Sequence, residues 1–473
     1  MATPSLPLPP VQLTRHISTA VWSSADKVLY LSLGLVFFLP QKVIGESSWG
    51  LFATSQAILT MMYMLADGFA LQVMVNFGVV ESQKKEAMTT GFVMYLFFIA
   101  VVTTAVWLGR EELALLWKKP DLAPLLGLFP LVAAGFFLRN LTLKIAQLHI
   151  DTRGTFIIDA AWVVAMIAML LHGWRTGWLV DELDMMIVSA ASAGVSSVVG
   201  LILYRRTLHF AKRVERTLFR KMFRFGITQI GSATTMSLLS QGDIIFLNMF
   251  GSNAAVIGNY DAAKKFFRGF EGIRDAGALF VYPAVARLSS QERWGELRTL
   301  LEKMIAFMTI VLIPIVLFIW FGPIDAIFAF IFKENYRLAP DLFRIMSLGA
   351  LAIPLSMNTY VLLGMSQVRK LFAVSSISLI LFIITSLLLV PRLGGQGQAI
   401  AMAVSFWSLG LLSIVLVVRL TELSPRRILR RWRDVLDFAR KAWRRGMREG
   451  RRKGKGREKE GRRKGEDGEK GRE

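Results

Sequence analysis

The sequence predicts an all-α polytopic membrane protein with about 12 transmembrane helices in two six-helix lobes. Of its 473 residues, 54% are hydrophobic and 19% are charged, whereas about 25% charged residues is usual in soluble proteins. Many apolar stretches are also long enough to cross about 30 Å of hydrocarbon as helices of roughly 20 residues. Basic residues are concentrated in every second loop, as the positive-inside rule requires. These observations exclude an ordinary soluble enzyme.

The expected spans fall into two groups. Five stretches are apolar enough to be spans on their own: 88–108, 185–204, 304–321, 372–390 and 399–418. Seven others contain internal polar groups: 21–43, 49–79, 122–146, 155–174, 226–249, 256–287 and 338–365. Residues 1–10 have no basic residue ahead of their apolar positions, so we expect no cleavable signal peptide. The chain has no cysteine and four histidines, which argues against disulfides and a zinc site.

Loop charges indicate both orientation and domain organisation. Segment 205–224 contains eight Lys and Arg against one Glu and divides the spans into six plus six. It is either an ordinary positive-inside loop or a helix lying in the membrane interface. We expect lobes at 1–204 and 225–420 joined by this linker. We also expect the protein to lie in the cytoplasmic (inner) membrane with both termini on the cytoplasmic side.

The net charge of +22 is concentrated at the C-terminus, because residues 425–473 hold 21 of the 56 Lys and Arg but 9 of the 34 Asp and Glu. Apolar residues from Ile428 to Trp443 follow helical spacing among these cations. This pattern predicts a basic amphipathic helix at 421–448 that binds anionic lipid headgroups, followed by a disordered tail at 449–473. No aromatic residue follows Trp443 to stack on a base, so no nucleic-acid partner is expected.

The two halves repeat each other. Gly50 and Asp67 are separated by 17 residues, as are Gly258 and Asp275, an offset of 208. Ala123-Pro124 matches Ala339-Pro340 at an offset of 216. With an even number of spans per half, the lobes are related by a pseudo-two-fold axis along the membrane normal, and a site is expected between them. No channel filter or catalytic set is present in the spans. The architecture is that of a transporter, not of an enzyme.

Several blocks at span edges resemble the oligosaccharide flippases, the polysaccharide transporter family of the multidrug/oligosaccharidyl-lipid/polysaccharide exporter (MOP) superfamily. They are Gly45-Glu-Ser-Ser-Trp-Gly50-Leu-Phe, Asp67-Gly68, Gly258-Asn-Tyr260-Asp-Ala-Ala, Tyr282-Pro-Ala-Val-Ala-Arg-Leu288 and Gly394-Gly-Gln-Gly-Gln-Ala399. The resemblance implies two lobes that alternate between inward and outward openings and pass an oligosaccharide on a polyprenyl diphosphate across the membrane for surface polysaccharide assembly. Lipid II flippases of the same superfamily resemble a form with fourteen spans. The sequence lacks the two additional spans, which argues against that function.

The eighth span carries seven charges between Asp261 and Asp275. Exposing all of them to lipid would cost roughly 20 kcal/mol. On a helical wheel six of the seven, all but Arg274, share one sector, with Phe266 and Phe270 on the opposite side. This favours a cavity-lining helix. The alternatives are an ion-pair lattice inside one lobe and a surface helix.

The ionisable residues of the spans supply the candidate site. Arg and Lys suit a diphosphate, and the phosphate candidates are Lys264, Lys265, Arg268, Arg139 and Lys27. The candidates for ion coupling or sugar contact are Asp26, Asp67, Asp243, Asp261, Glu271, Asp275, Gln241 and Tyr260. Asp26, Asp67 and Asp243 have a second interpretation, which is pairing with Arg139 or Lys27 for packing. No cofactor is expected beyond a coupling proton or sodium ion.

Three functions compete. The first is flipping of a lipid-linked oligosaccharide by a monomer in contact with membrane lipids. The second is a multidrug-type cation antiporter on the same fold, which needs an acidic, aromatic cavity, whereas the eighth span contains four cations and three acids. The third is a scaffold that does not transport and recruits partners through its basic tail.

Overall fold

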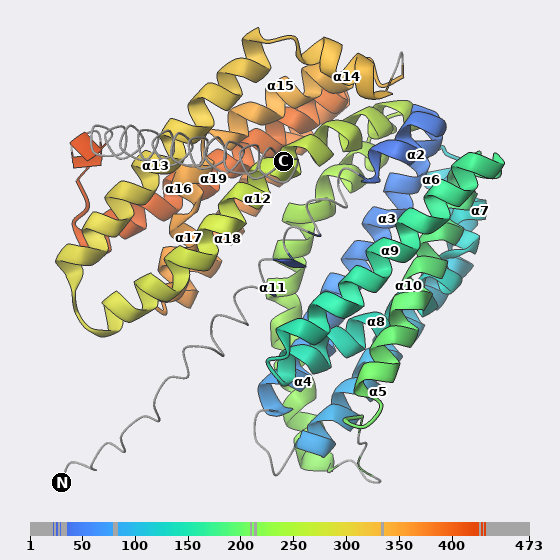
Figure 1. Ribbon diagram of the computed structural model, residues 1–473, viewed down its shortest axis with the longest axis horizontal. Coiled ribbons are helices and arrows are strands. Elements are labelled where there is room, and N and C mark those ends of the chain that lie inside the picture. Colours follow the sequence, from blue (N-terminus) through green and yellow to red (C-terminus); the bar gives the residue numbers. More distant parts are fainter. Residues whose placement is uncertain are drawn as a thin grey trace, which may run out of the picture.

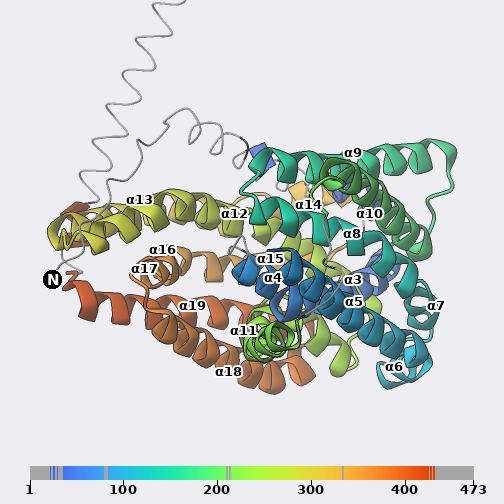
Figure 2. The same cartoon turned by 90° about the horizontal axis from the view of Figure 1, so that it is seen from below.

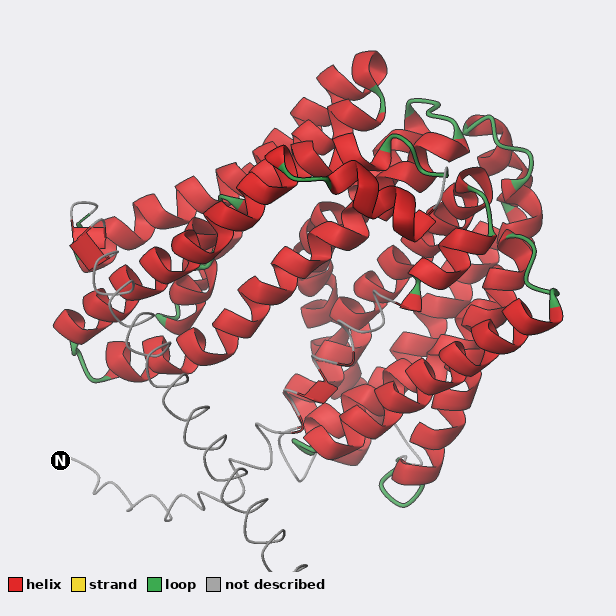
Figure 3. Cartoon of the chain, turned by 45° about the horizontal axis from the view of Figure 1, so that its top comes forward, coloured by secondary structure: helices red, strands yellow, loops and turns green. Residues whose placement is uncertain are grey.

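The computed structural model describes residues 22, 25–26, 29, 36–78, 84–208, 211, 215–332, 335–424, 427–428 and 430–431. These residues form helices joined by short connections, and no strand occurs among them (Figure 3). The all-α polytopic prediction is therefore confirmed. Residues 21, 23–24, 27–28 and 30–35 of the expected first span, which include Lys27, and the expected tail beyond residue 431 lie outside the described residues.

The helices follow one another in chain order with short connections. The first half contains α2 (Phe38–Val43), α3 (Glu46–Ala66), the π-helix η1 (Asp67–Leu71), α4 (Gln72–Gly78), α5 (Lys84–Leu108), α6 (Arg110–Leu116), α7 (Leu122–Gly127), α8 (Phe129–Leu148), α9 (Thr152–Thr176) and α10 (Glu182–Tyr204). The second half contains α11 (Arg216–Met249), α12 (Ala254–Ser290), α13 (Trp294–Phe321), α14 (Ile324–Phe332), α15 (Ala339–Ala350), α16 (Ile353–Ser356), α17 (Asn358–Gly364), α18 (Val368–Leu393) and α19 (Gly395–Thr421).

Local sequence explains where several of these helices begin and end. Asp181 accepts hydrogen bonds from the backbone N–H groups of Leu183 and Asp184, and the Asp184 carboxylate returns the contact to the Asp181 N–H, which is a capping box at the start of α10. Asn253 caps α12 through the N–H of Val256. Gly177 ends α9 at φ +73°, a left-handed conformation that glycine adopts without a steric penalty.

Eight of the described helical segments are long and apolar enough to cross a membrane, and the bent pair α15 with α16 and α17 makes a ninth. The expected spans at 226–249 and 256–287 correspond to α11 and α12, of 34 and 37 residues. At 1.5 Å per residue they are about 51 and 56 Å long, which exceeds the roughly 30 Å hydrocarbon core. Their higher polarity reflects the faces they present to the molecule's interior.

The helices form two lobes that lie side by side (Figures 1 and 2). We call the basic end the side that contains the connections at 149–151, 205–208, 291–293 and 365–367, and the opposite end the side that contains those at 117–121, 177–181, 250–253 and 394. Figure 1 shows the lobes in contact near α2 and α14, at the opposite end, and separating toward the basic end.

At the opposite end the lobes touch where α3 crosses α12. A Cβ added to Gly50 would lie 1.8 Å from the Ala254 carbonyl oxygen, and one added to Gly258 would lie 2.0 Å from the Glu46 carbonyl oxygen. The two helix backbones therefore meet directly, which only glycine permits. Asn259 Nδ2 donates to Glu46 Oε2 at 2.6 Å beside this crossing. Gly50 and Gly258 are the pair related by the repeat offset of 208.

Helix α11 lies between the lobes and packs on both. Toward the basic end, Gly226 approaches the Phe69 carbonyl oxygen, and Gly68 faces the Ala233 side chain, so this part of α11 contacts η1 of the first lobe. Toward the opposite end, the Phe246 ring lies 5.8 Å from the Phe382 ring of α18 in the second lobe.

Candidate functional site

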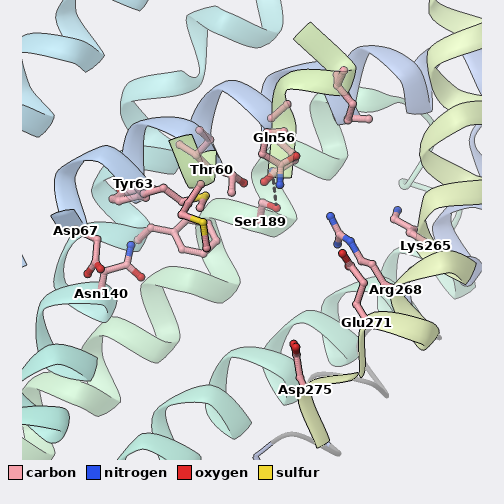
Figure 4. Close-up of a pocket in the computed structure, with 18 of the residues that line it drawn as sticks. Gln56, Thr60, Tyr63, Asp67, Asn140, Ser189, Lys265, Arg268, Glu271 and Asp275 are labelled. Carbon is pink, nitrogen blue, oxygen red and sulfur yellow. Dashed lines mark hydrogen bonds between the residues drawn. The ribbon is translucent and has the colours of Figure 1, made fainter. Parts of the chain in front are cut away.

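A cavity of about 1240 Å³ lies between the lobes. On the first lobe its polar lining comes from α3, η1, α4, α8 and α10: Gln56, Thr60, Tyr63, Asp67, Gln72, Arg139, Asn140, Lys144 and Ser189. On the second lobe α11 contributes Gln229, Ser232 and Gln241, and α12 contributes Asp261, Lys265, Arg268, Glu271 and Asp275. Figure 4 shows the α12 residues extending toward the polar residues of the first lobe. Each lobe therefore contributes one wall.

Two cations of α12 reach this cavity, and they differ in what they contact. Lys265 Nζ lies 3.2 Å from Asp261 Oδ2 and 3.5 Å from the centre of the Trp49 ring, which is a cation–π contact. Asp261 also accepts a hydrogen bond from Trp49 Nε1 at 2.8 Å. Arg268 makes no hydrogen bond or ion pair with any residue that the structure describes, and its guanidinium extends into the cavity (Figure 4). Arg268 is thus the cation available to an anionic ligand.

The two acidic residues nearer the C-terminus of α12, Glu271 and Asp275, also differ in their contacts. Asp275 Oδ1 accepts hydrogen bonds from Tyr360 Oη at 2.9 Å and from Arg274 Nε at 3.0 Å. Glu271 has no ion pair among the described residues. Phe266, expected on the far side of the stripe, also lines the cavity, and its ring stacks on that of Phe38 at 4.7 Å.

Lys264 does not line the cavity. Its Nζ lies 2.7 Å from Asp243 Oδ2 and donates to the Ser240 carbonyl oxygen at 2.6 Å. Tyr260 Oη donates to Asp243 Oδ2 at 3.0 Å, and Tyr260 is fully buried. These groups form a buried ionic cluster inside the second lobe. The ion-pair lattice expected as an alternative therefore describes Lys264, together with Asp243 and Tyr260. The other five residues of the stripe line the cavity, as the cavity interpretation expects: Asp261, Lys265, Arg268, Glu271 and Asp275. Gln241 lies at the cavity wall, with Nε2 3.4 Å from Ser240 Oγ.

On the first lobe Asp67 pairs with Lys144, whereas Arg139 pairs with Asp159. Lys27, the other expected partner, lies outside the described residues. Lys144 Nζ lies 2.8 Å from Asp67 Oδ1 and 3.4 Å from Gln72 Oε1. Asp67 begins the π-helical turn η1, and such turns occur frequently at functional sites. The pair is partly exposed to the cavity.

Arg139 lines the cavity but its guanidinium is already engaged. It forms a buried ion pair with Asp159 and lies 4.4 Å from the centre of the Trp162 ring. Asp26 is buried and is not among the described residues that line the cavity. Among the residues that the structure describes, the lining contains equal numbers of cations, Arg139, Lys144, Lys265 and Arg268, and carboxylates, Asp67, Asp261, Glu271 and Asp275. Lys264 and Arg274, which gave α12 its surplus, are turned toward the second lobe's own residues.

Sequence reasoning missed the neutral polar wall of the first lobe. Gln56 Nε2 donates to Ser189 Oγ at 3.2 Å, and Tyr63 Oη donates to the Ala133 carbonyl oxygen at 2.5 Å. Asn140 follows Arg139 directly and lines the same wall. Single neutral polar residues in apolar helices are common, and nothing in their spacing marked these for the cavity.

A second set of contacts joins the lobes at the opposite end. Lys119, in the connection before α7, donates through Nζ to Asn248 Oδ1 on α11, and Asn248 Nδ2 donates to Thr54 Oγ1 on α3 at 3.0 Å. Lys119 is 7% exposed. Burial lowers the pKa of Lys119 from 10.5 to about 8.

This depressed pKa predicts a pH-dependent stability. Between about pH 8 and about pH 10.5 the unfolded chain binds a proton at Lys119 that the folded chain releases, so the free energy of unfolding should rise with pH across this window. The check is the melting temperature of the native protein minus that of Lys119→Met, which should increase from pH 8 to pH 10.5. The neighbouring exposed Lys118→Met is the control. A constant difference between native protein and Lys119→Met would contradict the prediction.

The described helices form two lobes around a central cavity, as in a polytopic membrane protein. Residues 42–337 match the sequence model of a polysaccharide biosynthesis protein family. The chain belongs to this family. A sequence comparison with curated proteins gives no match.

Solved structures show the same fold. A multidrug resistance MATE family transporter of the MOP superfamily, in an inward-facing conformation, has 14% identity and a TM-score of 0.69 over 84% of this chain and 94% of its own. The lipid II flippase MurJ, in an inward closed conformation, has 12% identity and a TM-score of 0.68 over 89% and 91%. An outward-facing conformation of a MATE family transporter gives 14% identity and a TM-score of 0.58 over 85% and 95%.

Proposed function

We propose that the chain flips a polyprenyl-diphosphate-linked oligosaccharide across the cytoplasmic membrane by alternating access. Arg268 carries this proposal, because it is a cation without an ion-pair partner among the described residues, aimed into the cavity between the lobes. A guanidinium donates two parallel hydrogen bonds to a phosphate and remains charged at any physiological pH. Membership of a polysaccharide biosynthesis protein family supports a sugar-bearing substrate.

The size and lining of the cavity support a large polar headgroup. Its volume of about 1240 Å³ exceeds the 300–1,000 Å³ usual for small-molecule sites. Gln56, Asn140, Thr60 and Tyr63 line the wall facing α12 and offer neutral donors and acceptors for sugar hydroxyls. Arg268 would hold the diphosphate while this wall contacts the sugar.

The direction of opening supports loading from the cytoplasm. The lobes are joined at the opposite end by the α3–α12 crossing and separate toward the basic end (Figure 1). The positive-inside rule assigns the basic end to the cytoplasm, so both termini would lie there and the structure would be open inward. The greater similarity to an inward-facing than to an outward-facing MATE structure supports this assignment. We propose that the transporter works as a monomer in the inner membrane.

Ion coupling, by a proton or sodium, would act through Asp67 more readily than through Asp243. Lys264 already neutralises Asp243 in the buried cluster, so binding a cation there requires moving an ammonium group. Asp67 lies at the cavity, and its partner Lys144 is partly exposed. Protonation or ion binding at Asp67 would release Lys144 into the cavity.

The second candidate function is a cation antiporter, favoured by the equal numbers of acids and cations in the lining and by Glu271, which has no ion-pair partner among the described residues. The third candidate is a lipid II flippase, since the lipid II flippase MurJ has the same fold. Substrate-resolved transport separates the three functions.

The test is reconstitution in liposomes that contain a polyprenyl-diphosphate oligosaccharide. We expect Arg268→Ala to lower the flipping rate by on the order of tenfold or more, since a charge-assisted hydrogen bond contributes about 1.5–3 kcal/mol. Arg287→Ala, an exposed arginine of the same helix outside the cavity, is the matched control. An unchanged rate in Arg268→Ala would reject the phosphate assignment. Export of an organic cation that is lost in Glu271→Gln would support the antiporter instead.

A further inference from the structure

Four arginines surround a second pocket, of about 390 Å³, at the basic end of the second lobe. Arg298 lies on α13, and Arg427, Arg430 and Arg431 lie on the segment that follows α19. We call this site the arginine pocket. It shares no lining residue with the cavity between the lobes.

Two of the four arginines are positioned by acidic residues. Arg431 Nε lies 3.2 Å from Oε2 of Glu302, a carboxylate on a residue that is 2% exposed. Arg298 Nη2 lies 2.6 Å from Glu422 Oε2, and its Nε donates to the Thr421 carbonyl oxygen at the end of α19. Because these contacts connect α13 with the chain after α19, the pocket is a built feature of the fold.

The other two arginines, Arg427 and Arg430, are exposed and form no ion pair with any described residue. Among the described residues, four cations and the carboxylates of Glu302 and Glu422 leave a net charge of about +2 at the pocket. Guanidinium groups with free donors that converge on a concave site match the oxygen atoms of a phosphate.

The arginine pocket lies at the ends of the membrane-spanning parts of α13 and α19, at the edge of the hydrocarbon layer. Helix α19 ends at Thr421, and the apolar part of α13 lies beyond Glu302. Ile428 packs against the hydrophobic core of the second lobe, which includes Leu297 and Leu301 of α13, so the segment is docked on the helix bundle. Trp294, at the start of α13, is 37% exposed, as is typical of aromatic residues at the membrane interface.

We propose that the arginine pocket binds the phosphate group of an anionic phospholipid headgroup. Basic pockets between helices on the cytoplasmic side of membrane proteins bind such headgroups, and the level of this pocket at the span ends places it beside the lipid phosphates. A bound headgroup would hold Arg427 and Arg430 against α13 and so fix the segment after α19 to the lobe. This site goes beyond transport and does not depend on the identity of the transported substrate.

The test uses the full-length protein in neutral micelles, with phosphatidylglycerol as the probe and phosphatidylcholine as the reference lipid. We expect the double variant Arg427→Gln, Arg430→Gln to bind phosphatidylglycerol about tenfold more weakly, which is 1.4 kcal/mol. The double variant Arg205→Gln, Arg206→Gln removes the same charge from exposed positions at the same end and is the matched control. Its affinity should stay close to that of the native protein.

Two outcomes would overturn the proposal. Equal loss of affinity in both double variants would show that the lipid responds to overall charge and not to the pocket. Competition by inorganic phosphate at the same concentration as phosphatidylglycerol would assign the pocket to a soluble phosphate. Melting temperatures of all variants show whether each is folded, and flipping by the Arg427→Gln, Arg430→Gln variant tests the transport function separately.

Discussion

Replacing Gly50 by alanine should prevent the lobes from closing at the α3–α12 crossing and abolish most transport. The new Cβ would lie 1.8 Å from the Ala254 carbonyl oxygen, which belongs to a helix backbone and has no flexible end to move aside. Overpacking of this kind costs about 1–3 kcal/mol, and 1.4 kcal/mol shifts a conformational equilibrium tenfold. The equilibrium should move toward a state that is open at the opposite end.

Cysteine accessibility measures this shift directly, because the native chain has no cysteine. A single cysteine in place of Gln56, on the cavity wall, is labelled with a membrane-impermeant maleimide from each side of the membrane. In the Gly50→Ala background we expect labelling from the side of the opposite end to increase and flipping to fall by about tenfold.

Two further glycine substitutions test whether the close approach of the α3 and α12 backbones causes this effect. Gly258→Ala should behave like Gly50→Ala, since its Cβ would lie 2.0 Å from the Glu46 carbonyl oxygen. Gly194→Ala, in α10, is the control, because no atom lies within 4 Å of its added Cβ. Unaltered labelling in both Gly50→Ala and Gly258→Ala would show that the crossing does not close the cavity.

The buried ionic cluster predicts the largest effect on stability. Lys264→Met leaves Asp243 buried among Tyr260 and apolar residues without its ammonium partner. Breaking a buried pair by removing one member costs about 3–5 kcal/mol, whereas replacing both members by apolar residues is often neutral. We therefore expect a large fall in the melting temperature of Lys264→Met and recovery of most of it in Lys264→Met, Asp243→Leu.

The melting temperature in detergent, followed by tryptophan fluorescence, is the measurement. Lys303→Met, an exposed lysine of α13, is the control and should change it little. If the double variant melts as low as Lys264→Met, the two residues do not act as a pair. Loss of flipping in a double variant of native stability would instead give Lys264 a role in transport.

The spans and the charged stripe of α12 were predictable because both depend on patterns that are local in sequence. Hydrophobic length and loop charge located the helices, and helical spacing brought Asp261, Lys265, Arg268, Glu271 and Asp275 to one wall of the cavity. The repeat offset also matched Gly50 with Gly258, which meet at the crossing. Periodicity determines which residues share a face.

Periodicity does not determine what that face contacts. Lys264 and Lys265 point only about 100° apart on α12, yet one is buried in the second lobe and the other faces the first. The pairing of Asp67 with Lys144 and the grouping of Arg298 with Arg427 depend on helices that are distant in sequence. Such choices are made by tertiary packing, and a single sequence contains no direct signal for them.

The double attachment of α11 has a mechanical consequence. Its part near Gly226 and Ala233 lies against η1 of the first lobe, and Asn248 donates to Thr54 of the same lobe. Asp243 and Phe246 are held to α12 and α18 of the second lobe. Rotation of the two lobes as rigid bodies would therefore require α11 to bend or to give up its contacts with one of them. A stiff α11 would restrict how far the lobes can move relative to each other.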